Sequence, residues 1–228
     1  MTLADQITLA RLGLMPIAVA AYLVLPLYWC FWATAVVCAL AEYTDLLDGR
    51  VARARGEVSD FGKLADPFCD VIYRIGMFLA FLLPAGGAAF VVSDTALPRS
   101  EVPGQLVFLA HDGVAHAGLV PWLPVFLMVL REIIAGALRA MTATKGLVLA
   151  ARTSGKVKAW VQGATLLTCI SFPAVFFTQD PWILHWAFWS TWLCAVLSVL
   201  SIGEYIWVNR PVLGQLIERR PRTGESAA

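Results

Sequence analysis

Residues 45–70 have the sequence DLLDGRVARARGEVSDFGKLADPFCD, a polar stretch between two apolar ones. Asp45 and Asp48 are three residues apart, and Asp66 and Asp70 are four apart, so in helices each pair occupies one face. Two such helices present four carboxylates to a common point. Like charges crowded beside apolar segments repel one another, so the group needs a compensating cation.

The donor set indicates which cation this would be. A site built from carboxylate oxygens suits Mg2+ or Mn2+ better than zinc. The alternative interpretation is that the aspartates only form ion pairs with neighbouring Arg and Lys side chains at a hydrated edge.

Small residues accompany the carboxylates. Gly49 and Ala52 each lie one turn beyond an aspartate and leave that helix face bare, so that a planar base or a diphosphate can approach the backbone. Gly62 opens the facing segment in the same way. Arg53 follows with a permanently charged, forked guanidinium that suits phosphate oxygens.

The amino-acid composition indicates that this chain lies in a lipid bilayer. Of its 228 residues 59% are hydrophobic and 14% charged, and the mean hydropathy is +0.72, which is typical of a protein in a lipid bilayer. A net charge of +1 argues against a nucleic-acid partner. The five cysteines stand in apolar stretches without metal-ligand spacing, so we interpret them as packing thiols.

Six apolar runs approach the length of about 20 residues that a membrane-crossing helix needs. They predict an all-α integral membrane protein with six transmembrane helices, within a membrane domain of residues 1–210 that is followed by a polar cytoplasmic tail, 211–228. The predicted spans are Ile7–Leu25, Leu27–Thr44, Asp66–Val92, Leu119–Met141, Val157–Phe177 and Pro181–Val208.

The basic residues predict the orientation. Lys and Arg gather after the second span, after the fourth span and in the tail, whereas the opposite connections hold only Arg99. Because cytoplasmic flanks collect Lys and Arg, both termini and the segment 45–70 are expected in the cytoplasm, and residues 93–118 form an external loop. We expect a bacterial-type inner or cell membrane with the active site facing the cytoplasm.

The polar segment resembles the signature of the CDP-alcohol phosphatidyltransferase family, with all eight fixed positions present. The resemblance implies a six-helix membrane domain, a homodimer, two Mg2+ or Mn2+ ions and a CDP-linked donor such as CDP-diacylglycerol. It also implies that the four aspartates hold the metals, that Asp70 is in addition the general base, and that the small residues and the arginine shape the nucleotide site. The eight positions are Asp45, Asp48, Gly49, Ala52, Arg53, Gly62, Asp66 and Asp70.

A second informative stretch covers residues 131–158. Arg131 lies within an apolar run, where a guanidinium needs a carboxylate, a phosphate or water. Arg139 is about two turns further on the same face. One interpretation is a pocket for an anionic substrate. The other is that Arg131 pairs with an aspartate of the predicted metal cluster and that the remaining basic residues only set the topology.

A further resemblance favours the pocket. Arg131-Glu132-Ile133 followed by Leu138-Arg139, and Gly155-Lys156-Val157-Lys158, are similar to patterns of the phosphatidylglycerophosphate synthases. This similarity implies sn-glycerol 3-phosphate as the phosphorylated alcohol that accepts the phosphatidyl group, with phosphatidylglycerophosphate and CMP as products. Arg131, Arg139 and Lys156 would hold the phosphate of the acceptor.

The sequence departs from those synthases in three ways that bear on the acceptor, one of which is an external loop before Gly118 that is longer than usual. Asp5 replaces a usual Asn, and Val71 replaces a common Lys, although Arg74, one turn beyond Asp70, can supply that charge. Inositol phosphate therefore stays open as an alternative acceptor. An anion transporter is a more remote alternative, because such proteins usually show repeated halves with broken helices and this sequence shows no such repeat.

Overall fold

A computed structural model of the chain describes residues 3–55, 60–86, 90–91, 103–110, 115–143, 153–176 and 181–217. Within these ranges it is mostly helical, with six helices and three short strands. In chain order they are α1 (Leu3–Val24), α2 (Leu27–Arg55), α3 (Asp60–Ala80), β1 (Phe90–Val91), β2 (Gln105–Ala110), β3 (Ala115–Pro121), α4 (Trp122–Ala143), α5 (Thr153–Phe176) and α6 (Pro181–Ile217).

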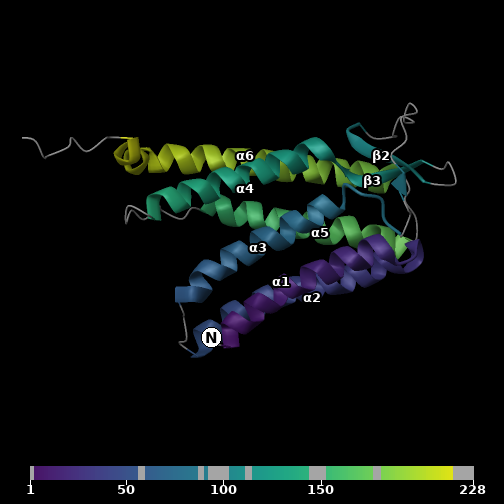
Figure 1. Ribbon diagram of the computed structural model, residues 1–228, viewed down its shortest axis with the longest axis horizontal. Coiled ribbons are helices and arrows are strands. Elements are labelled where there is room, and N and C mark those ends of the chain that lie inside the picture. The colour runs from purple at the N-terminus through teal and green to yellow at the C-terminus, as the bar shows by residue number, and fades with distance from the viewer. Residues whose placement is uncertain are drawn as a thin grey trace, which may run out of the picture.

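The helices lie along the length of the molecule and the strands lie at one end of it (Figure 1). At the opposite end are the C-terminal ends of α2, α4 and α6 and the N-terminal ends of α3 and α5 (Figure 1). The parts of α2 and α3 that carry the polar sequence therefore extend to the same end as the C-terminal end of α4 and the N-terminal end of α5, remote from the sheet.

A proline makes the turn between the first two helices. Leu25 and Pro26 alone separate α1 from α2. Because a proline disfavours helical backbone in the residue before it, α1 ends there. The Pro26 carbonyl then accepts hydrogen bonds from the backbone N–H groups of Trp29 (2.8 Å) and Cys30 (3.0 Å), which starts α2. The two helices contain the first two predicted apolar runs, and α2 continues past the predicted end at Thr44 to Arg55.

The third helix is shorter than expected. The predicted span Asp66–Val92 is wrong at its C-terminal end, because α3 covers Asp60–Ala80. Pro84 lies beyond its end, and Gly86 has φ +92°, a left-handed conformation that glycine adopts at no steric cost. The Gly86 N–H donates to the carbonyl of Tyr22 (3.1 Å), so the chain after α3 is fastened to α1.

The sheet lies where an external loop, residues 93–118, and the start of a helix were expected. β2 pairs with β1 on one side and with β3 on the other, antiparallel in both cases. Residues 119–121 belong to β3, so α4 begins at Trp122 and the predicted start at Leu119 is wrong. Short apolar runs fit a strand as well as a buried helix, which is why the sequence pattern did not distinguish them.

The sheet is tied closely to the end of α3. The Leu119 N–H donates to the Phe81 carbonyl (2.8 Å). A Cβ at Gly118 would lie 2.3 Å from the Leu82 carbonyl oxygen, so only glycine fits this approach of β3 to the chain after α3. The strands therefore form a cap joined to the helices by backbone contacts.

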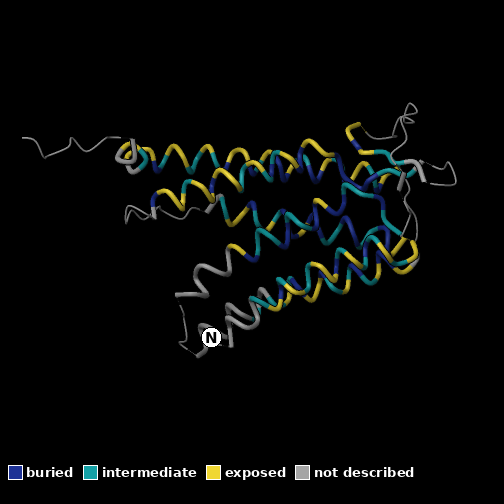
Figure 2. Tube along the Cα trace, viewed as in Figure 1, coloured by how far each residue is buried: buried dark blue, intermediate teal, exposed yellow. Residues whose placement is uncertain are grey.

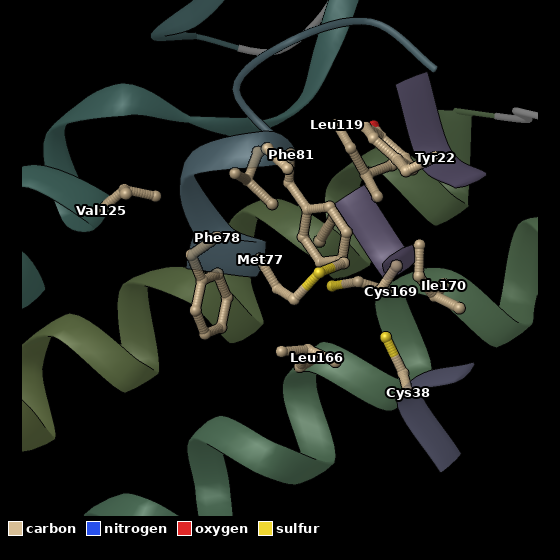
Figure 3. Close-up of a cluster of buried hydrophobic side chains, with 14 of the residues drawn as sticks. Tyr22, Cys38, Met77, Phe78, Phe81, Leu119, Val125, Leu166, Cys169 and Ile170 are labelled. Atoms are coloured by element: carbon tan, nitrogen blue, oxygen red, sulfur yellow. The ribbon is translucent and has the colours of Figure 1, made fainter. Parts of the chain in front are cut away.

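The core lies between the helices next to this cap. Figure 3 shows Tyr22 of α1, Leu119 of β3 and Cys169 of α5 around Phe81, just after α3. The rings of Tyr22 and Phe81 are 5.3 Å apart, and the Tyr22 hydroxyl donates to the Leu83 carbonyl (3.2 Å). This cluster fixes α1, α3 and α5 against one another.

Exposed residues recur along the helices (Figure 2), and many of them are large and apolar. Trp160 is 75% exposed, Trp189 67% and Trp207 66%. Two stretches in the described part of the chain, Gly155–Phe176 and Pro181–Pro211, are long and apolar enough to cross a membrane. Leu9–Val24 and Trp29–Thr44 are shorter apolar stretches of α1 and α2.

Candidate functional site

The signature residues lie on two successive helices. Asp45, Asp48, Gly49, Ala52 and Arg53 belong to the C-terminal part of α2, whereas Gly62, Asp66 and Asp70 belong to the N-terminal half of α3. The expected helical placement of both aspartate pairs is confirmed. Of the four aspartate side chains the structure describes that of Asp70, and the other three lie outside the described side chains.

Asp70 is held by two arginines. Its Oδ2 accepts a hydrogen bond from Nη1 of Arg74 one turn further along α3 (2.8 Å), and its Oδ1 lies 3.6 Å from Nη1 of Arg11 on α1. The Arg11 side chain is 1% exposed and that of Asp70 25%. The carboxylate is therefore fixed from two helices while one side of it remains accessible, as a group that acts on a substrate requires.

Glu42 completes this group of charges. Its Oε2 lies 3.5 Å from Nη2 of Arg74, so Arg74 bridges α3 and α2. Two arginines and two carboxylates then balance one another. A Cβ added at Gly163 of α5 would come within 3.3 Å of the Glu42 carboxylate, which places that helix directly against the pair. The prediction that Arg74 supplies a positive charge beside Asp70 is confirmed. The contact of Arg74 with Glu42 was not predicted from the sequence.

A second group of charges joins α4, α5 and α6. Nη1 of Arg131 donates to Oε2 of Glu132 (2.9 Å), and Nε of Arg131 donates to the Ser201 hydroxyl on α6 (3.2 Å). Lys158 on α5 pairs with Oε1 of Glu132. Among the described side chains, the acidic partner of Arg131 is thus its neighbour Glu132.

The other two predicted acceptor residues are more exposed. Arg139 bonds through Nε to the Ala135 carbonyl one turn back on α4 (3.3 Å), and Lys156 is exposed near the start of α5. The hydrogen bonds and ion pairs described for Arg131, Arg139 and Lys156 do not connect these three residues. The buried lysine of this region is Lys158, two positions beyond the predicted one.

The chemistry of the first site suits a divalent cation. Its four candidate ligands are carboxylates from two helix segments at one end of the molecule, and hard oxygen donors of this kind fit Mg2+ or Mn2+. In the part of the chain with described side chains, no group of three or more His, Cys, Asp or Glu residues converges. Three of the four aspartates lie outside that part.

Residues 1–200 match the model of a family described as CDP-alcohol phosphatidyltransferase. The chain belongs to this family. The CDP-alcohol phosphatidyltransferase match extends from α1 into α6 and therefore includes both groups of charges.

Curated relatives of this family member resemble it over most of their length. It is 28% identical over 223 residues to the CDP-diacylglycerol–glycerol-3-phosphate 3-phosphatidyltransferase of Bacillus subtilis, covering 91% of this chain and 94% of that protein. A protein of the same name from Pseudomonas fluorescens is 26% identical, over 82% of this chain and 77% of that protein.

A solved structure shows the same fold. The apo form of Mycobacterium tuberculosis phosphatidylinositol phosphate synthase superposes with a TM-score of 0.57 and 20% identity, covering 96% of this chain and 94% of the other. At this identity the likeness concerns the fold alone.

Proposed function

We propose that this phosphatidyltransferase moves the phosphatidyl group of CDP-diacylglycerol to sn-glycerol 3-phosphate, which yields phosphatidylglycerophosphate and CMP in phospholipid biosynthesis. The observation that carries the proposal is the similarity, along nearly the whole chain, to relatives that bear the name of this reaction. The eight signature positions and the basic residues of α4 and α5 are consistent with it.

The setting that we propose is a membrane crossed six times. Two stretches have the required length, α1 and α2 contain shorter apolar ones, and large apolar side chains cover the outward faces of the helices. The basic residues at the end remote from the sheet favour a cytoplasmic active site in a bacterial-type inner or cell membrane. The family resemblance supports a homodimer.

In the mechanism that we propose, Asp45, Asp48, Asp66 and Asp70 hold two Mg2+ or Mn2+ ions, which when bound neutralise the diphosphate of the donor. The acceptor hydroxyl attacks the phosphorus that carries the diacylglycerol, a P–O bond forms there, and the P–O bond to CMP breaks. Asp70 removes the proton of the attacking hydroxyl.

The remaining signature residues serve the donor. Gly49, Ala52 and Gly62 leave room for the nucleotide at the backbone of α2 and α3, and Arg53 binds phosphate oxygens. The contacts of Asp70 with Arg74 and Arg11 support its role, because they fix the orientation of the carboxylate from two helices.

The acceptor would bind between α4 and α5. Arg131, Arg139 and Lys156 hold its phosphate, since guanidinium and ammonium groups form strong charge-assisted hydrogen bonds with phosphate oxygens. Arg131 and Lys158 bring two positive charges to a buried group with the single negative charge of Glu132. The surplus positive charge favours an anionic substrate.

One assay tests the reaction and the acceptor together. CMP release from CDP-diacylglycerol is measured on the purified protein with Mg2+, separately with glycerol 3-phosphate, inositol phosphate, serine and inositol. We expect the fastest release with glycerol 3-phosphate and none after chelation of the metal. Faster release with inositol phosphate would overturn the acceptor, and no release with any of the four would overturn the reaction.

A further inference from the structure

The charged group between α4, α5 and α6 is almost fully enclosed. The side chain of Arg131 is 10% exposed, and those of Glu132 and Lys158 are each 8% exposed. Charges removed from water to this extent are costly unless they are paired. Apolar side chains could pack the same helices together without this cost. The presence of three charged side chains therefore indicates a role other than packing.

The contact between Arg131 and Glu132 does not follow from their positions on α4. Successive residues of a helix point about 100° apart, so neighbours do not normally face each other. Nη1 of Arg131 and Oε2 of Glu132 nevertheless lie 2.9 Å apart. A contact with a neighbouring helix can hold two such side chains together.

Lys158 on α5 makes such a contact with Glu132. It pairs with Oε1 of Glu132, the oxygen that Arg131 does not use. Glu132 is therefore held between two cations, one on its own helix and one on the neighbouring helix. Ser201 of α6 accepts a hydrogen bond from Nε of Arg131, and this second contact fixes the plane of the guanidinium.

We propose that Glu132 and Lys158 are positioning residues that orient Arg131 toward the phosphate of the acceptor. This inference rests on the proposed function, in which Arg131 binds that phosphate. Lys158 orients Glu132, and Glu132 and Ser201 together orient Arg131. Of these residues only Arg131 contacts the acceptor. A forked guanidinium binds a phosphate in two places only when its plane is correctly turned, so a loss of orientation weakens acceptor binding.

The test compares Lys158→Met, Glu132→Gln, the double variant of both, and Arg131→Gln. For each the KM of glycerol 3-phosphate, the KM of CDP-diacylglycerol, kcat and the midpoint of thermal unfolding are measured in the same detergent. Lys158→Met and Glu132→Gln should each raise the acceptor KM roughly 10-fold, with the donor KM changed less than about twofold.

The double variant separates positioning from mere stability. Glu132→Gln leaves two buried cations, Arg131 and Lys158, without their shared anion, whereas the double variant leaves only Arg131 without it, so the unfolding midpoint of the double variant should rise above that of Glu132→Gln. Its acceptor KM should stay raised, because Arg131 is still not oriented. A recovery of both quantities would show that the pair is only structural and would overturn the inference.

Arg131→Gln distinguishes this failure from failure of the proposed pocket. If it raises the acceptor KM and the Lys158 and Glu132 variants do not, Arg131 binds the acceptor without help and the positioning role is wrong. If Arg131→Gln leaves the acceptor KM unchanged, the pocket itself is wrong. Should the charge variants fail to fold, Ser201→Ala, which removes the other contact of Arg131, must still raise the acceptor KM selectively.

Discussion

The surroundings of single side chains decide what each charged residue of this chain can do. Asp70 lies between Arg11 and Arg74, and one quarter of its side chain is exposed. These two contacts fix the orientation of the carboxylate, and a group that removes a proton from a bound hydroxyl must be held in position. Its remaining exposure leaves an approach for a substrate.

Asp70→Asn should abolish turnover and largely spare donor binding, because the amide keeps the shape of the side chain but does not accept a proton. General-base catalysis contributes about 100-fold or more to a rate, so less than about one hundredth of the activity should remain. Single-turnover CMP release measures this, with CDP-diacylglycerol binding as the control. A variant that keeps more than about a tenth of the rate contradicts the assignment of Asp70 as the base.

Arg74→Met should destabilise the protein, since it leaves Glu42 and Asp70 facing each other without their shared cation. Breaking a buried ion pair costs about 3 to 5 kcal/mol, and the partial exposure of both carboxylates favours the lower figure. Thermal unfolding in detergent measures the change. Arg139→Met, which removes the same group from an exposed position, should change stability by less than about 0.5 kcal/mol. Equal effects of the two substitutions would refute the bridging role of Arg74.

At the scale of elements, the chain that follows α3 and the sheet approach each other closely. Gly118 brings β3 to the Leu82 carbonyl, and Gly86 fastens the chain after α3 to α1. These contacts involve backbone atoms, which cannot turn aside as a flexible side chain does. The sheet and the helices therefore unfold together.

Gly118→Ala tests this join. The new methyl group would meet the Leu82 carbonyl at 2.3 Å, so the substitution should destabilise the protein by about 1 to 3 kcal/mol. Gly136→Ala on α4 is the matched control, because nothing lies within 4 Å of its added Cβ. In a helix interior that change should stabilise by about 0.5 to 1 kcal/mol. Unfolding midpoints with the same sign for both variants would contradict the steric argument.

Prediction from the sequence succeeded where long apolar runs end at strong local signals. Pro26 placed the turn between α1 and α2, and the aspartate spacing placed both pairs on helices. It failed between Ala80 and Trp122, where apolar runs too short to define a period form strands and Pro84 and Gly86 follow the end of α3.

In the candidate site, only contacts between residues of the same helix could be predicted from the sequence. Asp70 and Arg74 are one turn apart, so their contact follows from helical spacing. The contact of Glu132 with Lys158 joins residues 26 positions apart on different helices, and that of Arg131 with Ser201 joins residues 70 apart. Such pairs depend on how the helices pack, and the spacing of residues in one sequence does not contain that information.

For the whole molecule, the separation of the sheet from the polar helix ends predicts opposite sides of the membrane. Leu106→Cys in β2 and Gly214→Cys near the end of α6 both place a thiol at an exposed position. In intact cells an impermeant thiol reagent should label the first variant and not the second. The native cysteines are all buried, so the background should be low. Labelling of Leu106→Cys only after lysis would reverse the proposed orientation.

The tight turn at Pro26 also has a consequence for how such a protein is made. In a chain that spans the membrane as proposed, the two residues between α1 and α2 form too short a connection for one helix to insert independently of the other. We therefore expect the two helices to enter the bilayer together as one hairpin, and a nascent chain that is cut short within α2 to insert less stably than one that contains both helices.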